Sequence, residues 1–131
     1  MRAFVDTNVL VRHLTGEPPE QARRATAFLA GANELLLADL VVAELVYVLE
    51  SFYEVGREQV AELVRAVLGF SAAVVLDSAL LLRAVEVYEV DRLDFAEAYL
   101  VASAEASGVG VIASFDQTID RVPSIERIEP T

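Results

Sequence analysis

The chain has no cysteine, no lysine and a single histidine among its 131 residues. The absence of cysteine excludes disulfides, thiolate zinc sites and a cysteine nucleophile. With only one histidine as well, zinc is a poor fit, because zinc sites in proteins are built mainly from cysteine and histidine. All ten basic residues are arginine, the better bidentate phosphate contact of the two basic side chains.

The sequence also lacks long apolar runs and flexible linkers. No window reaches the roughly 18–20 uninterrupted apolar residues of a membrane span, and no signal peptide opens the chain. We therefore expect a soluble cytoplasmic protein with no membrane partner. No Pro/Gly/Ser-rich stretch divides the sequence, so we expect one domain over residues 1–131.

The net charge and the mean hydropathy of the chain lead to separate expectations about its partners. The formal net charge of −11 argues at face value against a nucleic-acid-binding domain, an argument that weakens if bound metal neutralises several acids. The mean hydropathy of +0.45 is high for a small domain. Apolar surface should be left over once the core is filled, which predicts an oligomer or a permanent partner.

Short apolar runs alternate with helical periodicity along the chain. The pattern predicts strands at 2–6, 35–38, 72–76 and 109–113, an edge strand at 125–128, helices at 7–14, 19–32, 40–54, 57–69, 78–90 and 95–107, and a helical turn at 117–121. Asp39, and Asp77 or Ser78, are expected to cap the helices that they precede, and Gly108 to end one. This alternation predicts an α/β fold with a central parallel sheet of four to five short strands covered by helices on both faces.

Two aspartates follow predicted strands. Asp6 comes directly after the first strand, and Asp116 follows the strand at 109–113. Open α/β sheets bind their ligands at the carboxyl ends of strands, so both residues are candidate ligands. For Asp6, a role as a helix N-cap explains the sequence equally well.

Glu44 stands out on a helix that is apolar nearly all round. Its neighbours three and four residues away are Leu40, Val41, Tyr47 and Val48. An uncompensated buried carboxylate costs several kcal/mol, so this position predicts a functional acid. The alternative is that Glu44 pairs with an arginine or reaches water at a helix edge.

Asp94 and Glu97 lie three residues apart, on one face near the start of a predicted helix. Helix N-termini favour acids in any case, and capping is the better explanation for Asp94. Glu97 is followed at helical spacing by Leu100 and Val101, and these apolar neighbours favour a functional role for Glu97 over a purely structural one.

Two further polar residues are interpreted as structural. His13 lies one helix length beyond Asp6 and is expected to be a surface or packing residue rather than a base. Asp120 is expected to be an exposed residue of the helical turn.

Carboxylates brought close together repel one another, and divalent cations relieve that repulsion. Mg²⁺ and Mn²⁺ prefer oxygen ligands and keep several waters. Such a site activates water and stabilises the attacking and leaving oxygens of a phosphodiester, usually with two ions about 3.5–4 Å apart.

These motifs together resemble a PIN domain, and within that family the VapC-type toxin of bacterial and archaeal toxin–antitoxin pairs. Four motifs in order carry the resemblance, which covers essentially the whole chain: Phe4-Val5-Asp6-Thr7-Asn8-Val9-Leu10, Ala43-Glu44, Asp94-Phe95-Ala96-Glu97-Ala98 and Ser114-Phe115-Asp116.

The resemblance implies a Mg²⁺- or Mn²⁺-dependent endoribonuclease with two metal ions. It would cut single-stranded RNA such as tRNA and leave 5′-phosphate and 3′-hydroxyl ends. Asp6, Glu44 and Asp116 fall on metal-site positions. Ser114 falls on a small hydroxyl position that orders the last loop, and Thr7 and Asn8 fall beside the first acid.

The chain departs from the family pattern at the third acid, where the family usually has aspartate and this chain has Glu97. Asp94 falls on an optional acid position. Three alternatives follow: Glu97 still reaches a metal, Asp94 replaces it, or one ion binds weakly.

The resemblance also implies a small antitoxin whose C-terminal segment lies across the toxin, and we expect a homodimer. The helices at 40–54 and 57–69, with Phe52, Tyr53 and Val60, are the candidate groove; plain core packing is the alternative.

Two other functions compete with the ribonuclease. One is a PIN-like protein-interaction module with little or no catalysis. The other is a phosphatase of the haloacid-dehalogenase kind with Asp6 as nucleophile, but the second aspartate that this chemistry usually needs is replaced by Asn8 and there is no lysine.

Overall fold

The computed structural model describes residues 1–131, which divide into two compact units, Met1–Leu76 and Asp77–Thr131. The first unit contains β1 (Arg2–Phe4), α1 (Thr7–Thr15), α2 (Pro19–Gly31), β2 (Glu34–Leu36), α3 (Asp39–Ser51), α4 (Arg57–Leu68) and β3 (Ala73–Val74). The second contains α5 (Ser78–Glu86), the π-helical turn η1 (Val87–Asp91), α6 (Phe95–Ser107), β4 (Val111–Ala113), the 3-10 helix η2 (Gln117–Arg121) and β5 (Glu126–Ile128).

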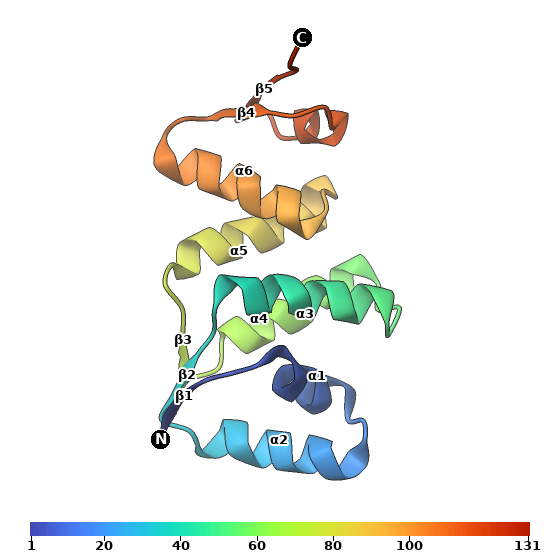
Figure 1. The fold of residues 1–131 in the computed structure, drawn as a ribbon, viewed down its shortest axis with the longest axis vertical. Coiled ribbons are helices and arrows are strands. Elements are labelled where there is room, and N and C mark those ends of the chain that lie inside the picture. Colours follow the sequence, from blue (N-terminus) through green and yellow to red (C-terminus); the bar gives the residue numbers. More distant parts are fainter. The chain divides into compact units, whose positions relative to one another are not determined.

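The three strands of the first unit form a parallel sheet in the order β1-β2-β3 (Figure 1). Ala3 pairs with Leu35, and Leu35 in turn pairs with Ala73. One further bond, from the amide of Val5 to the carbonyl of Leu36, extends the ladder beyond β1. The chain leaves the sheet at the next residue, Asp6, which therefore stands at the carboxyl end of β1.

The helices of the first unit pack in series. α1 packs against α2 and α3, and α3 packs against α4. Their apolar stripes meet in a core whose fully buried members include Leu10, Leu35, Leu45, Leu49, Val60 and Val64. Burial of these stripes holds the start of α1 next to the end of β1.

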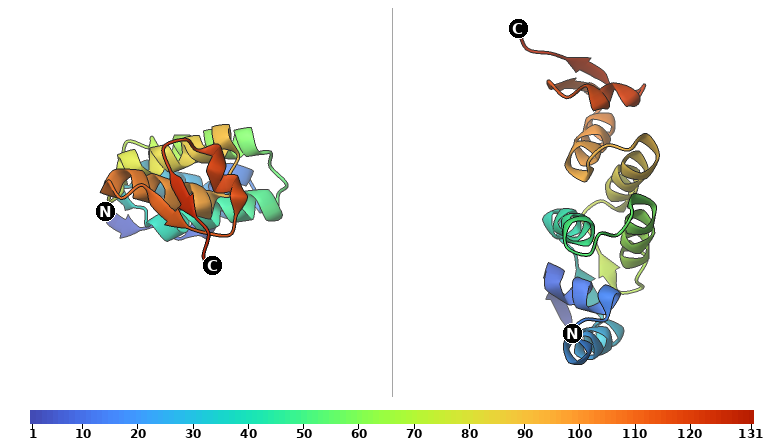
Figure 2. Two further views of the ribbon diagram at one scale, coloured as in Figure 1. Left: turned by 90° about the horizontal axis from the view of Figure 1, so that it is seen from above. Right: turned by 90° about the vertical axis from the view of Figure 1, so that its right-hand side faces the viewer.

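The second unit places a helix pair beside a two-stranded parallel sheet. α5 packs against α6, and β4 pairs with β5 with Ile112 opposite Arg127. The helix η2 lies against β5 (Figure 2). Tyr88 and Phe95 pack edge to face in the core, with their ring centroids 6.0 Å apart.

Several helix ends follow the sequence signals. Gly108 ends α6 in the left-handed region with φ +78°, as predicted, and Gly16 ends α1 in the same way with φ +74°. Asp77 caps α5 by accepting a hydrogen bond from the amide of Leu80 at 3.1 Å. The prediction that Asp39 caps α3 is wrong, because Ala38 is the N-cap and Asp39 is the first helical residue, where the helix dipole still favours an acid.

The α/β class with parallel strands is confirmed. Five short strands form two parallel sheets, one in each unit, and six α-helices accompany them. None of these helices combines the length and the apolar character that crossing a membrane requires.

Candidate functional site

Asp6 lies at the junction of β1 and α1 and is exposed. It is the N-cap of α1, and its Oδ1 accepts a hydrogen bond from the amide of Thr7 at 2.9 Å. The capping alternative is thus present in the structure. It uses one carboxylate oxygen, and the second makes no hydrogen bond or ion pair, so capping and metal binding are compatible at Asp6.

Thr7 is the one buried polar side chain of the chain, at 3% exposure. Its hydroxyl has no hydrogen-bond partner in the protein. Buried hydroxyls normally have a partner, so this one has unused capacity. Thr7 lines a pocket of about 280 Å³ together with Asn8 and Glu44, which brings a carboxylate of α3 to the start of α1.

The structure corrects the argument for Glu44, which is exposed and not buried. The buried stripe of α3 consists of Val42, Leu45, Val46 and Leu49. Two of the apolar neighbours that suggested burial are themselves exposed, Leu40 at 83% and Tyr47 at 64%. Apolar neighbours did not imply a buried face here, because α3 has more apolar residues than its packing partners cover. Glu44 is exposed to water at the edge of the helix.

In the second unit, Glu97 of α6 and Asp116 at the end of β4 share one partner. The hydroxyl Oγ1 of Thr118 lies 3.0 Å from Glu97 Oε2 and 2.8 Å from Asp116 Oδ1. The amide of Thr118 also donates to Asp116 Oδ1 at 2.9 Å. One threonine therefore holds two carboxylates that are 19 positions apart in the sequence.

The two carboxylates titrate differently because their surroundings differ. Burial raises the pKa of Glu97, and hydrogen bonding and repulsion from Asp116 raise it further, although the Thr118 hydroxyl opposes the shift. The amide of Thr118 lowers the pKa of Asp116, helped by the Glu97 and Thr118 side chains. A cation bound here would relieve the repulsion between the two carboxylates.

Asp94 stands at the N-cap position of α6 but its side chain makes no capping hydrogen bond. The prediction that capping accounts for Asp94 is therefore wrong. The backbone of Asp94 does start the helix, since its carbonyl accepts from the amide of Ala98 at 2.8 Å. Its exposed carboxylate contributes to the raised pKa of Glu97 through charge repulsion.

The loop after β4 is held by hydrogen bonds from both ends. Ser114 Oγ accepts from the amide of Asp116 at 2.9 Å, and the Ser114 carbonyl accepts from Arg127 Nη1 at 2.8 Å. Asp116 in turn caps η2 through Thr118. These bonds fix the backbone that carries the Asp116 carboxylate.

Thr118 is the site residue that the sequence reasoning missed. The signal was present, because an aspartate followed two residues later by threonine favours a turn in which the carboxylate accepts the downstream amide. The contact with Glu97 had no such signal, since it depends on how α6 packs beside the loop.

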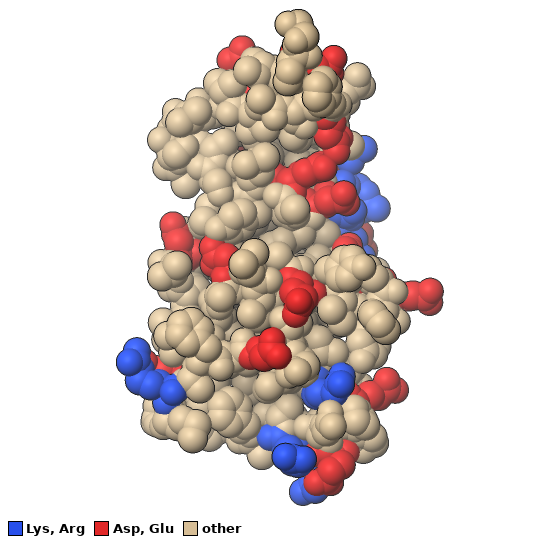
Figure 3. Space-filling model, in the orientation of Figure 1, with Lys and Arg blue, Asp and Glu red and all other residues tan.

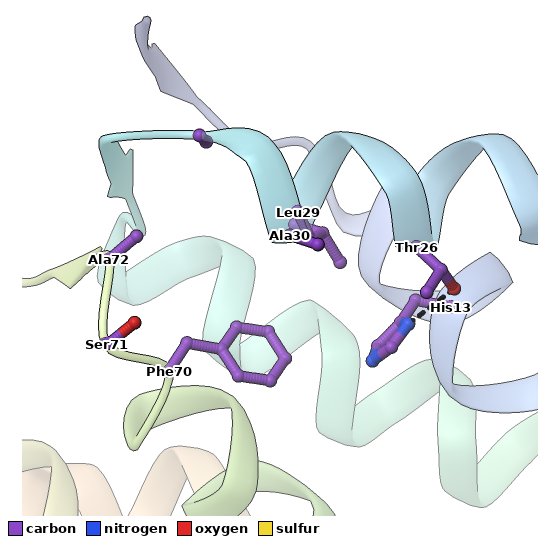
Figure 4. Close-up of a pocket in the computed structure, with 8 residues that line it drawn as sticks. His13, Thr26, Leu29, Ala30, Phe70, Ser71 and Ala72 are labelled. Carbon is purple, nitrogen blue, oxygen red and sulfur yellow. Dashed lines mark hydrogen bonds between the residues drawn. The ribbon is translucent and has the colours of Figure 1, made fainter.

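His13 and Asp120 have the structural roles predicted for them. His13 Nδ1 hydrogen-bonds Thr26 Oγ1 at 2.8 Å, and its ring packs edge-on against Phe70 with the centroids 5.8 Å apart (Figure 4). These groups line a pocket of about 280 Å³ formed by α1, α2 and the residues before β3. Asp120 is exposed and pairs with Arg127 at 3.0 Å.

Of the three residues named for the candidate partner groove, Phe52 and Tyr53 line a pocket and Val60 does not. Phe52 is 80% exposed and lines the pocket of Thr7 and Glu44 together with Tyr53. Val60 is fully buried in the core, so the packing alternative is correct for that residue.

The donor atoms suit a hard divalent cation. Asp6, Glu44, Asp94, Glu97 and Asp116 offer only carboxylate oxygens, and Thr7 adds an unpartnered hydroxyl. Oxygen donors of this kind fit Mg²⁺ or Mn²⁺ and do not fit zinc. Within either unit taken alone, no three acidic or histidine side chains lie close enough to hold an ion. Asp6 and Glu44 belong to the first unit, and Asp94, Glu97 and Asp116 belong to the second.

The sequence was compared with known protein families and with curated proteins. No curated protein matches the chain. The PIN domain matches residues 3–125, a range that includes every acid named above. The chain therefore belongs to the PIN domain family.

Proposed function

We propose that the chain is a divalent-metal-dependent endoribonuclease that hydrolyses RNA phosphodiester bonds in the cytoplasm, as the toxin of a type II toxin–antitoxin pair of the VapC type. PIN domains are generally metal-dependent nucleases. The observation that carries the proposal is the family match over residues 3–125, which spans all the strand-end and helix-start acids. The substrate is RNA, with tRNA one form that it could take.

In this proposal Asp6, Glu44, Glu97 and Asp116 are the ligands of Mg²⁺ or Mn²⁺, with two ions bound and Asp94 as an additional acid. Bound metal would supply a water of lowered pKa and positive charge near the phosphate. The chain's part is to present ionised carboxylates in fixed positions. Thr7 and Asn8 support Asp6, while Ser114 and Thr118 support Asp116.

Two features of the pocket support a role for Thr7 beyond helix packing. Its hydroxyl is buried without a partner, and the pocket that it lines also contains Glu44 and Asn8. A hydroxyl in that state is costly unless something accepts or supplies a hydrogen bond. A metal-bound water is a suitable partner.

The partner part of the proposal rests on exposed apolar side chains. Leu40, Tyr47 and Phe52, all on or next to α3, are 83%, 64% and 80% exposed. Large apolar side chains gathered on one element favour a protein partner. We propose a cognate antitoxin there, and a homodimer as the assembly of the toxin.

The test compares two aspartates that both cap helices. Asp6→Asn and Asp77→Asn each keep a side chain that caps well, and each removes one negative charge. If Asp6 is a metal ligand, Asp6→Asn abolishes Mn²⁺-dependent cleavage of RNA, and Asp77→Asn cleaves as the wild type does. EDTA should silence the wild type and Asp77→Asn alike.

Equal cleavage by both variants would show that Asp6 is not part of the metal site.

Isothermal titration calorimetry with MnCl₂ distinguishes the proposed enzyme from a protein-interaction module without catalysis. Absence of Mn²⁺ binding at millimolar concentration in the partner-free chain would favour the module.

A further inference from the structure

A second pocket, of about 650 Å³, begins at Asp6 and extends over α1 and α2. Its polar and aromatic lining comes from the end of β1 and from one face of each helix: Phe4, Asn8, Arg12, Gln21, Arg24 and Phe28. All of these residues belong to the first unit.

Helical spacing explains why these side chains share one wall. Asn8 and Arg12 are four residues apart on α1, and Gln21, Arg24 and Phe28 follow at i, i+3 and i+7 on α2. Residues at these spacings lie on the same face of a helix. The α2 wall is about 10 Å long, from seven residues at 1.5 Å each.

The two arginines of this pocket lack carboxylate partners. Arg12 Nε donates to the amide oxygen of Gln21 at 2.9 Å, and Arg24 makes no ion pair. The adjacent Arg23, on the same helix, pairs with Glu20. In a chain with 21 acids and ten basic residues, two guanidinium groups without carboxylate partners in one pocket are a local concentration of positive charge.

Two phenylalanine rings flank the same pocket. Phe4 is 75% exposed and Phe28 is 36% exposed. Exposed aromatic rings next to a positively charged groove are the usual platform for unpaired bases. On the face drawn in Figure 3, basic side chains lie over the part of the first unit where Figure 1 places α1 and α2, with acidic side chains between them.

We infer that this pocket binds the single strand of RNA whose phosphodiester is brought to Asp6, with phosphates on Arg12 and Arg24 and bases against Phe4 and Phe28. The inference rests on the proposed ribonuclease activity and names the path of its substrate. A single strand fits better than a duplex, because paired bases are stacked on one another and do not reach the rings. The pocket also resolves the conflict between a charge of −11 and a nucleic-acid substrate, since the binding charge is local.

The test measures binding separately from cleavage. A fluorescein-labelled 12-nucleotide RNA is titrated with the full chain carrying Asp6→Asn, which prevents cutting, and anisotropy gives the affinity at several NaCl concentrations. Adding Arg24→Gln or Arg12→Gln should weaken binding by about threefold or more, and should make the slope of log Kobs against log[NaCl] less negative by about 0.7 for each arginine. Phe28→Leu should weaken binding without changing the slope.

Arg23→Gln is the matched control, because it removes the same charge from the neighbouring position on the same helix but outside the pocket. It should leave affinity and slope unchanged. If Arg24→Gln behaves like Arg23→Gln, or if a duplex of the same sequence binds as tightly as the single strand, the inference is overturned.

The failure of this inference is distinct from that of the enzyme proposal. Cleavage of RNA with unchanged KM in Arg24→Gln would contradict the proposed RNA path and leave the proposed nuclease activity standing. If RNA binding is salt-dependent and requires Arg24, but the chain cuts no RNA, the proposed RNA path is supported and the proposed nuclease activity is contradicted. Thermal unfolding followed by circular dichroism checks that each variant is folded. Arg24 is exposed, so its replacement is expected to leave the fold intact.

Discussion

At the scale of single residues, Thr118 hydrogen-bonds two of the candidate acids, Glu97 and Asp116. Its hydroxyl carries one proton, so it donates to either Glu97 or Asp116 at a given moment, while its amide always donates to Asp116. The hydroxyl contributes to lowering the pKa of both carboxylates. Thr118 thus favours the ionised state that a metal ligand needs.

The variant Thr118→Val removes this hydroxyl and keeps the shape of the side chain. The pKa of Glu97 and of Asp116 should both rise, since a hydrogen bond to their charged forms is lost. Metal affinity should therefore fall more at mildly acidic pH than at neutral pH. Carboxyl ¹³C NMR titrations report the pKa values directly.

Thr118→Ser is the control for that change, because serine keeps the hydroxyl. Its two pKa values and its Mn²⁺ affinity should stay near those of the wild type. Identical titration curves for the valine and serine variants would show that the hydroxyl has no electrostatic role.

At the scale of secondary-structure elements, one arginine links α5 to α6. Arg83 Nε lies 2.8 Å from Glu105 Oε1, and Arg83 also pairs with Glu86 on its own helix. The Arg83 guanidinium lowers the pKa of Glu105, and its own pKa is raised mainly by Glu105. The inter-helix bond is thus charge-assisted on both sides.

The sign of the pH effect follows from the lowered pKa of Glu105. Stability from this group is fully present above its ordinary value of 4.5 and is lost as the pH falls through the lower folded-state value. Glu105→Gln should reduce the free energy of unfolding by about 1 kcal/mol at neutral pH. The difference from the wild type should disappear at strongly acidic pH, as measured by urea unfolding.

Glu86→Gln changes the other partner of the same arginine. The Glu86 side chain is 55% exposed and that of Glu105 is 23% exposed, so solvent screens Glu86 more. The Glu86 variant should be closer to the wild type. A larger loss from Glu86→Gln would place the important contact within α5 instead of between the helices.

At the scale of the whole molecule, the net charge of −11 couples metal binding to stability. Cations that bind the folded chain stabilise it by about 2.7 kcal/mol when their concentration is 100 times Kd. Mn²⁺ should therefore raise Tm of the wild type, and NaCl at equal ionic strength should raise it less. Differential scanning calorimetry measures both shifts.

The same experiment on Asp6→Asn has two expected outcomes. Without metal the variant should be no less stable than the wild type, since one repelling charge is gone. With Mn²⁺ the shift in Tm should be much smaller than in the wild type. A full Mn²⁺ shift in Asp6→Asn would mean that the stabilising ions bind elsewhere.

The sequence by itself determined the local features of this protein. The alternation of apolar runs and helical stripes predicted the parallel α/β class, and residues such as Asp77 and Gly108 predicted where helices begin and end. The position of Asp6 and Asp116 after their strands followed in the same way. These features depend on neighbours a few residues away, so periodicity and capping are enough to predict them.

Only the tertiary structure decided what covers each face and which distant side chains meet. Glu44 has apolar neighbours and is nevertheless exposed, because it lies outside the buried stripe of α3. Glu97 and Thr118 meet across 21 positions, and Arg12 and Arg24 share a pocket because α1 packs on α2. Helical periodicity says which residues share a face, but burial and long-range contacts depend on the packing of whole elements.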